Sequence, residues 1–270
     1  MRITNNVLMW CVVLIMLLCI ACDDMEDKPR EVYVPAYTEN TSMFVLSEGL
    51  FHSNNSSLAM VDFGNRQAYT EYFLLVNKRR LGDTGNDMGL YGSKLYVVVN
   101  ISSQLEVLDV HTGISLKQIP FFTENGKARE PRFVDFLDGK AYVCSFDGTV
   151  TKIDTTTLEV EAVVSVGKNP DGLCIANNKL YVSNSGGLNY PSYDSTVSVV
   201  DIASFQEIKQ IPVGVNPSVM HPDKAGNVYV VTRGNYGSEG ASFVKIDTQA
   251  DTVSRRFDEV KSLNFTIHND

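Results

Sequence analysis

Residues 179–201 read KLYVSNSGGLNYPSYDSTVSVVD, two short apolar segments separated by a polar, glycine-containing one. Lys179–Asn184 and Val197–Asp201 are rich in β-branched and aromatic residues, so each predicts a β-strand. Asp201 ends the second segment, and an aspartate there can accept hydrogen bonds from backbone N–H groups just ahead of it. The stretch therefore predicts two strands joined by a long loop and followed by a tight turn.

Both segments recur along the chain. The first has counterparts at Met43–Ser47, Lys94–Val99, Lys140–Ser145 and Asn227–Thr232. The second has counterparts at Leu58–Asp62, Leu105–Asp109, Val150–Asp154 and Phe243–Asp247. The closing aspartates, Asp62, Asp109, Asp154, Asp201 and Asp247, are 47, 45, 47 and 46 residues apart. We interpret these aspartates as turn formers and not as catalysts.

Two further segments complete each repeat. A third strand leaves the turn, as in Leu158–Val164 and Ile208–Ile211, and a proline loop such as Asn169-Pro170-Asp171 leads to a closing strand, Gly172–Ala176. No convincing amphipathic helix interrupts the cycle. Four-stranded sheets repeated every 40–50 residues are typical of β-propellers, in which each twisted blade buries its faces against its neighbours. The sequence predicts an all-β propeller domain over residues 42–270, with five repeats visible.

The motifs resemble those of the YVTN-type β-propeller repeat family. The residues that carry this resemblance are Tyr181–Asn184, Val197–Asp201, and the loops Val166–Pro170 and Val213–Pro217, within a region of about residues 43–269. Ser47–Phe51 and Arg80–Asp83 are similar to a Bacteroidetes surface-lipoprotein branch of that family. The branch includes cobalamin-capturing lipoproteins, so the resemblance implies a non-catalytic protein that captures a small nutrient.

Members of that family usually have seven blades, whereas five repeats and one strand-like segment, Ser262–His268, are visible here. Two interpretations follow. The chain is a truncated form of a longer propeller, which would leave an open edge. Alternatively, it is a closed five-blade ring in which the C-terminal segment completes the first repeat.

The N-terminal residues predict export and lipid anchoring. Residues 1–21 carry one charge, Arg2, and an apolar run from Val7 to Ala21 that is shorter than the roughly 20 residues of a membrane span, which is typical of a signal peptide. Leu18–Cys22 resembles a bacterial lipobox, with Cys22 as the lipidated residue. Acidic residues follow at once, Asp23–Asp27, as in lipoproteins exported to the cell surface. We expect an outer-membrane lipoprotein facing the exterior (alternatively the periplasm), with residues 22–41 as a tether.

Charge and cysteine content bear on possible partners and on disulfide formation. The chain has a net charge of −9 and no stretch dense in Lys or Arg, which argues against nucleic-acid binding. Contact with the membrane is expected only through the lipid. Cys144 and Cys174 remain after the signal and the lipid site, and both lie in apolar segments. We predict two buried, unpaired thiols, with a disulfide as the alternative.

The proline loops and the loops after the Tyr-Val strands are expected to line one face of the propeller, where binding residues concentrate. The predicted ligand-binding residues are Glu48, Phe51, Arg80, Asn86, Asp87, Asn100, Arg132, Phe146, Asn169, Asp171, Asn184, Tyr190, Tyr193, Arg233 and Tyr236.

The sequence carries no paired metal-ligand motif and no nucleophile-elbow motif, so no metal, cofactor or catalytic residue is expected. The expected function is capture of a small nutrient, with a cobalamin-like ligand as the leading candidate, for an outer-membrane transporter. A protein–protein interaction scaffold on the cell surface is the alternative, and a propeller lyase or hydrolase is a further one.

Overall fold

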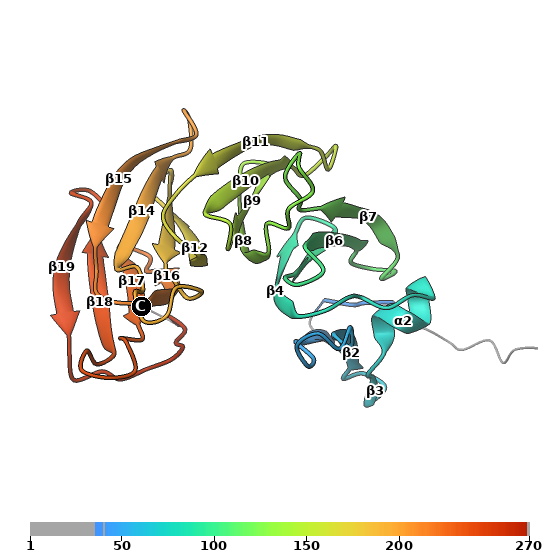
Figure 1. Cartoon of the computed structure of the whole chain (residues 1–270). Helices are drawn as coiled ribbons and strands as arrows, with labels where there is room; N and C mark the ends of the chain where they lie inside the picture. The colour runs from blue at the N-terminus through green and yellow to red at the C-terminus, as the bar shows by residue number, and fades with distance from the viewer. Residues whose placement is uncertain (1–35, 40, 269–270) are drawn as a thin grey trace, which may run out of the picture. The chain divides into compact units, whose positions relative to one another are not determined.

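The computed structural model describes residues 36–39 and 41–268 (Figure 1). The predicted signal peptide, the lipidation site Cys22 and residues 22–35 of the tether lie outside the described residues. The first sheet contains β1 (Ser42–Ser47), β2 (Ser57–Asp62) and β3 (Gln67–Tyr69). The second contains β4 (Gly85–Tyr91), β5 (Lys94–Val99), β6 (Gln104–Asp109) and β7 (Ser115–Pro120).

Three further four-stranded sheets follow. The third sheet contains β8 (Pro131–Leu137), β9 (Lys140–Ser145), β10 (Thr149–Asp154) and β11 (Val160–Ser165). The fourth contains β12 (Pro170–Ala176), β13 (Lys179–Asn184), β14 (Thr196–Asp201) and β15 (Gln206–Pro212). The fifth contains β16 (Pro217–Pro222), β17 (Val228–Thr232), β18 (Ser242–Asp247) and β19 (Thr252–Phe257). Paired strands are antiparallel throughout, and the predicted β-propeller blades are confirmed.

The second strand of each full sheet is buried on both of its faces. In β5 the side chains from Leu95 to Val99 are all buried, and β9 and β13 repeat the pattern. Such strands read as continuous apolar runs, because both faces of a blade pack against neighbouring blades. Cys144 of β9 and Cys174 of β12 are buried free thiols, as predicted, and burial raises the pKa of Cys144 to about 12.

The turn aspartates behave as predicted. In every repeat the carboxylate accepts at least one backbone N–H group two or three residues ahead, as when Asp154 accepts those of Thr156 and Thr157. The other four acceptors are Asp62, Asp109, Asp201 and Asp247. The regular spacing of 45–47 residues between these aspartates is therefore the distance along the chain from one such hairpin turn to the next.

The first repeat differs from the prediction. Its sheet has three strands, and a helix, α2 (Tyr72–Asn77), follows β3 where no helix was expected. Tyr72 and Phe73 are buried, and helix α2 contacts β2. The helix therefore buries its two aromatic side chains next to the three-stranded sheet.

The C-terminal segment does not complete the first sheet, so this part of the closed-ring interpretation is wrong. Residues 262–268 form no strand. The Phe265 ring packs instead against His221 of β16 and Phe243 of β18, with centroid distances of 5.1 and 4.7 Å. The segment therefore packs against the fifth sheet.

Neighbouring sheets meet through their first strands, since β4 contacts β8, β8 contacts β12, and β12 contacts β16. Partly buried carboxylates cross two of these junctions. Asp87 accepts the backbone N–H of Val134 at 2.9 Å, and Asp135 accepts that of Ile175 at 3.0 Å. Each carboxylate thus fixes the register between one sheet and the next.

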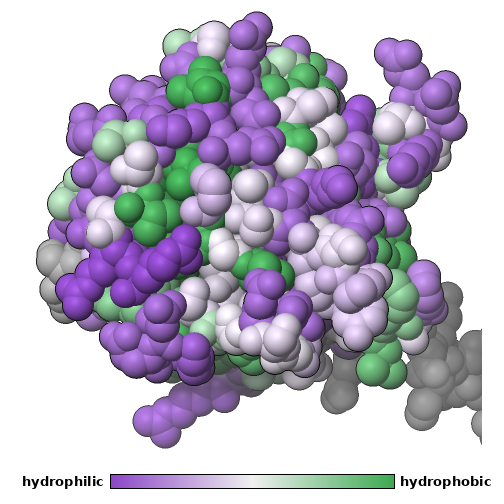
Figure 2. All heavy atoms as spheres, turned by 60° about the vertical axis from the view of Figure 1, so that its left-hand side comes forward, coloured by the Kyte–Doolittle hydropathy of each residue, from purple (hydrophilic) through white to green (hydrophobic). Residues whose placement is uncertain are grey.

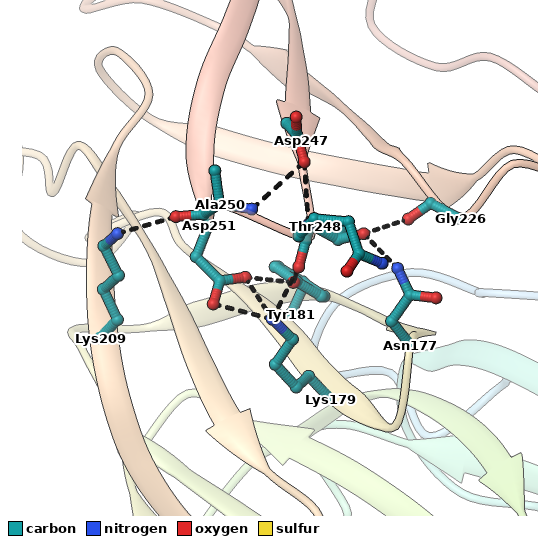
Figure 3. Close-up of polar contacts among 10 residues, drawn as sticks. Asn177, Lys179, Tyr181, Lys209, Gly226, Asp247, Thr248, Ala250 and Asp251 are labelled. Carbon is teal, nitrogen blue, oxygen red and sulfur yellow. Dashed lines mark hydrogen bonds and ion pairs between the residues drawn. The ribbon is translucent and has the colours of Figure 1, made fainter.

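A polar network joins the fourth and fifth sheets at the turn ends (Figure 3). Lys179 of β13 donates to Asp251 at 2.7 Å and to the carbonyl oxygen of Thr248 at 2.7 Å. Asn177 donates to the Thr248 hydroxyl, which donates in turn to the carbonyl oxygen of Gly226. The network satisfies loop backbone groups that the sheets leave unpaired.

The molecular surface is polar on the face that Figure 2 shows, where hydrophobic residues form small, separated patches. Within the described ranges, no helix has the length and apolar composition that crossing a bilayer requires.

Candidate ligand-binding face

A cavity of about 340 Å³ takes lining residues from all five sheets. The local backbone explains why these side chains reach it. At the start of the first strand in the second to fifth sheets the ladder register shifts, as between Pro131 and Phe133 and between Pro170 and Leu173. Such a bulge removes a residue from regular pairing and redirects its side chain. Arg132 and Asp171 both lie at these bulges and both line the cavity.

Equivalent positions after the second strands supply four more lining residues. Asn100, Phe146, Ser185 and Arg233 each follow directly on β5, β9, β13 and β17, and all four line the cavity. The site is therefore largely a product of the repeat, because the position after the second strand lines the cavity in four sheets and the bulge position lines it in two.

The centre of the site is a carboxylate shared by two arginines. Asp171 Oδ1 accepts from Arg132 Nε at 2.9 Å and lies 2.8 Å from Arg132 Nη2. Asp171 Oδ2 accepts from Arg233 Nη1 at 3.1 Å. The Asp171 side chain is 5% exposed, whereas those of Arg132 and Arg233 are 17% and 30% exposed. The third, fourth and fifth sheets thus meet at one ion-pair cluster, which we call the arginine triad (Arg132, Asp171, Arg233).

The Phe146 ring supports the triad from one side. The guanidinium carbon of Arg132 lies 4.5 Å from the ring centroid, a distance typical of a cation–π contact. Asn169 donates to the Phe146 carbonyl oxygen at 2.8 Å, which holds this loop in place. The stacked ring restricts the rotamers of Arg132, so its guanidinium keeps one orientation in the cavity.

Tyrosines from the fourth and fifth sheets form the rim. The Tyr193 ring makes edge contacts with Tyr190 and with Tyr236, each at 6.0 Å between centroids. Tyr193 and Tyr236 line the cavity, and Tyr236 is 68% exposed. Phe51 and Leu188 add exposed apolar surface to the lining. The rim offers large rigid contact area at low entropic cost.

Most of the predicted binding residues lie in this cavity. Those that line it are Glu48, Phe51, Asn100, Arg132, Phe146, Asp171, Tyr193, Arg233 and Tyr236.

Six predicted residues lie elsewhere. Asn169 and Asn184 are used in internal hydrogen bonds, and Asn184 is fully buried against Thr196 and Ser198. Tyr190 packs on Tyr193 outside the lining, and Arg80 is exposed on the surface. Asn86 and Asp87 line other cavities.

The lining also contains residues that sequence reasoning missed: Thr84, Ser185, Gly187, Leu188 and Asn216. The repeat held the signal for one of them. Asn216 precedes Pro217 as Asn169 precedes Pro170, and both asparagines have positive φ angles, 58° and 45°. At this equivalent position, Asn169 makes hydrogen bonds within the loops of the fourth sheet, whereas Asn216 of the fifth sheet lines the cavity.

A second cavity of about 600 Å³ is lined by the first strands β4, β8, β12 and β16. It contains Asp87, Asp135 and His221. Burial raises the pKa of Asp87 to about 6 and raises that of Asp135 as well, while burial lowers the pKa of His221. Both carboxylates accept a backbone N–H group of the next sheet, so we assign them a structural role.

Chemical groups for catalysis are sparse in the cavity of about 340 Å³ around the arginine triad, which we call the arginine cavity. Its described lining holds no His, Cys or Lys. In residues 36–39 and 41–268, no three or more His, Cys, Asp and Glu side chains are grouped so as to hold a metal ion. The arrangement suits binding through charge-assisted hydrogen bonds and aromatic contact.

Comparisons with known proteins agree with the fold. Residues 41–262 match the family described as "Domain of unknown function (DUF5074)". No curated protein matches the chain. A solved structure titled hydrazine synthase, from Kuenenia stuttgartiensis, is similar with a TM-score of 0.56 at 17% identity, over 64% of this chain and 48% of that one. The WD40 β-propeller domain of Doa1 gives a TM-score of 0.46 at 13% identity, over 56% of this chain and 48% of that one. The chain thus spans about half the length of either structure.

Proposed function

The chain belongs to the DUF5074 family, and we propose that its propeller face captures a small molecule without transforming it. The observation that carries this proposal is the arginine triad beneath the tyrosine rim. Five sheets contribute to one cavity of about 340 Å³, which is within the range of roughly 300–1,000 Å³ typical of small-molecule sites. Its few polar groups converge and its rim is aromatic, the usual composition of such a site.

The state of the carboxylates supports binding over catalysis. Asp171 accepts hydrogen bonds from two guanidinium groups, one on each carboxylate oxygen. Both oxygens are therefore directed at protein donors, which is not the geometry of a catalytic group that exchanges a proton with a ligand. Glu48, the other acidic residue in the lining, is exposed and has no bonded partner among the described residues. We therefore propose a binding protein and not an enzyme.

The proposed setting comes from the N-terminal sequence. Cys22 follows a lipobox-like segment, and acidic residues come directly after it. We place the domain on the outer membrane through a lipid on Cys22, facing the exterior, where it would pass its ligand to an outer-membrane transporter. The resemblance to the YVTN-type family and its surface-lipoprotein branch makes a corrinoid the first ligand to test. A corrinoid is larger than this cavity, so it would bind by one edge or side group.

Calorimetry on the full chain in detergent, titrated with a corrinoid panel and other nutrients, tests the proposal. We expect heat from at least one ligand, abolished by Tyr236→Ala and Arg132→Gln. Arg255→Gln is the matched control, because Arg255 is an exposed arginine on β19, stacked on Phe257. Binding that survives both lining substitutions contradicts capture at this face.

A protein partner is the second candidate, and two residues favour it. Leu188 and Tyr190 are 64% and 75% exposed on the long loop between β13 and β14. Crosslinking on intact cells followed by capture of the chain tests this function. Tyr190→Ala would then reduce a specific crosslink while leaving small-molecule heat unchanged, whereas the reverse pattern favours capture.

A further inference from the structure

The arginine triad carries more positive than negative charge. Two guanidinium groups share the single carboxylate of Asp171, so one positive charge has no partner within the triad. Arginine keeps its charge at all physiological pH values. The exposed side chain of Glu48 lies in the same lining, where water screens it. The buried part of the cavity is therefore electropositive, although the whole chain has a net charge of −9.

Unused hydrogen-bond donors lie at the same place. A guanidinium group has five N–H donors. Arg132 uses those of Nε and Nη2 on Asp171, and Arg233 uses Nη1. The other guanidinium N–H groups of both arginines have no partner among the described residues. The side chains of Arg132 and Arg233 are partly exposed, and none of their nitrogens is among the buried atoms that lack a partner in the described residues, so these donors face the open cavity, where a ligand can accept from them.

The surroundings of the two arginines strengthen the electrostatic binding of an anion there. Phe146 covers one face of Arg132 and excludes water from it, which lowers the local dielectric constant. Because two arginines from different sheets present their donors to one space, a planar or tetrahedral oxyanion can accept from both. The tyrosine rim next to them suits a flat or apolar group on the same molecule.

We propose that the ligand of this face carries an oxyanion, a carboxylate or a phosphate, bound jointly by Arg132 and Arg233, with an uncharged flat portion against Tyr193 and Tyr236. This inference rests on the proposed function and adds the chemical class of the ligand. Asp171 is a positioning residue in this arrangement, because it holds both guanidinium groups and competes with the ligand for their donors.

Small matched probes test the class without knowledge of the natural ligand. Ligand-observed NMR titrations of the full chain would compare phenyl phosphate with phenol, and benzoate with benzamide. We expect the anionic member of each pair to bind roughly tenfold more tightly or better, since a charge-assisted hydrogen bond contributes at least the free energy of one decade in affinity. Added salt weakens only the anionic probes.

Substitutions assign the effect to the triad. Arg132→Gln and Arg233→Gln should each remove most of the anion preference, and Arg255→Gln should retain it. Arg132→Lys should restore part of it, which a purely structural role for the arginine would not. Asp171→Asn should increase affinity for phenyl phosphate, because it removes a competing carboxylate. Thermal unfolding of each variant shows whether the fold is intact.

The outcomes separate this inference from the proposed function. No detectable binding of either anionic probe at millimolar concentration overturns the anion class. An anion preference that persists in both arginine variants overturns it too. If a neutral nutrient binds and Tyr236→Ala abolishes that binding, capture stands while the anion class falls. If the anionic probes bind through the arginines and no nutrient in the panel binds, the anion class stands and nutrient capture falls.

Discussion

Tyr181 of the fourth sheet donates its phenolic hydroxyl to Asp251 of the fifth sheet at 2.5 Å. The same carboxylate pairs with Lys179, and both side chains of that ion pair are mostly buried. One aspartate in a turn thus satisfies two donors from a neighbouring sheet.

Asp251→Asn should destabilise the domain by about 1–3 kcal/mol, because it removes the charge that two buried donors require. Asparagine is the suitable replacement, since the φ of residue 251 is 51° and asparagine tolerates that region. Urea denaturation measures the change. Asp258→Asn, at an exposed position, should have little effect. A double-mutant cycle with Tyr181→Phe should show coupling between the two residues, and additive effects would contradict a stabilising hydrogen bond between Tyr181 and Asp251.

Asp154→Asn should lower the melting temperature at neutral pH and have less effect in acid. The ion pair with Lys140 and the turn N–H groups hold the pKa of Asp154 below its usual value. A depressed carboxyl pKa stabilises the fold above the unfolded pKa, and this contribution is lost as pH falls through the folded pKa. Melting curves of both proteins between neutral pH and pH about 3 check this, and a difference that grows in acid would be inconsistent with it.

Asp87→Asn should have the opposite effect and stabilise the fold at neutral pH. Burial raises the pKa of Asp87 to about 6, with Asp135 nearby raising it further and Arg132 opposing. A raised carboxyl pKa means that stability falls as pH rises from the unfolded pKa to about 6. The amide keeps an acceptor for Val134 and carries no charge, so the variant should gain about 2 kcal/mol at pH about 7 and nothing at pH about 4. If the variant and the unsubstituted protein differ by the same free energy of unfolding at both pH values, a raised pKa of Asp87 is contradicted.

Gly172→Ala should destabilise the junction between the fourth and fifth sheets by about 1–3 kcal/mol through overpacking. A Cβ atom there would lie 2.3 Å from the Ser218 carbonyl oxygen and 2.7 Å from the Ser183 hydroxyl. Gly240→Ala is the control, because its Cβ would meet nothing closer than Lys261 Nζ at 3.7 Å. Denaturant unfolding compares them, and equal effects would show that the junction adjusts.

Local chemistry made the strands and turns predictable. Apolar runs such as Lys94–Val99 and the turn aspartates need only a few neighbouring residues to define them, and the structure has them where the sequence placed them. Helix α2 escaped prediction because the first repeat is degenerate, and a short apolar segment there packs as a helix on β2.

The site was predictable in part. Sequence could place Arg132 and Asp171 in equivalent proline loops, yet their contact depends on how neighbouring sheets stack. The same limit explains the residues that lie elsewhere. Asn184 ends a strand next to a binding loop, but its amide turns inward to the buried hydroxyl groups of β14. The direction in which the Asn184 side chain points is thus decided by its hydrogen-bond partners on the neighbouring strand.

The five-sheet origin of the arginine cavity has a consequence for measurement. A ligand that touches side chains from several sheets binds only when those sheets are correctly docked, so ligand affinity and unfolding free energy are linked quantities. Each tenfold excess of ligand over its dissociation constant adds a fixed increment to stability. A search for the natural ligand can therefore proceed by melting temperature alone, with the protein acting as its own reporter.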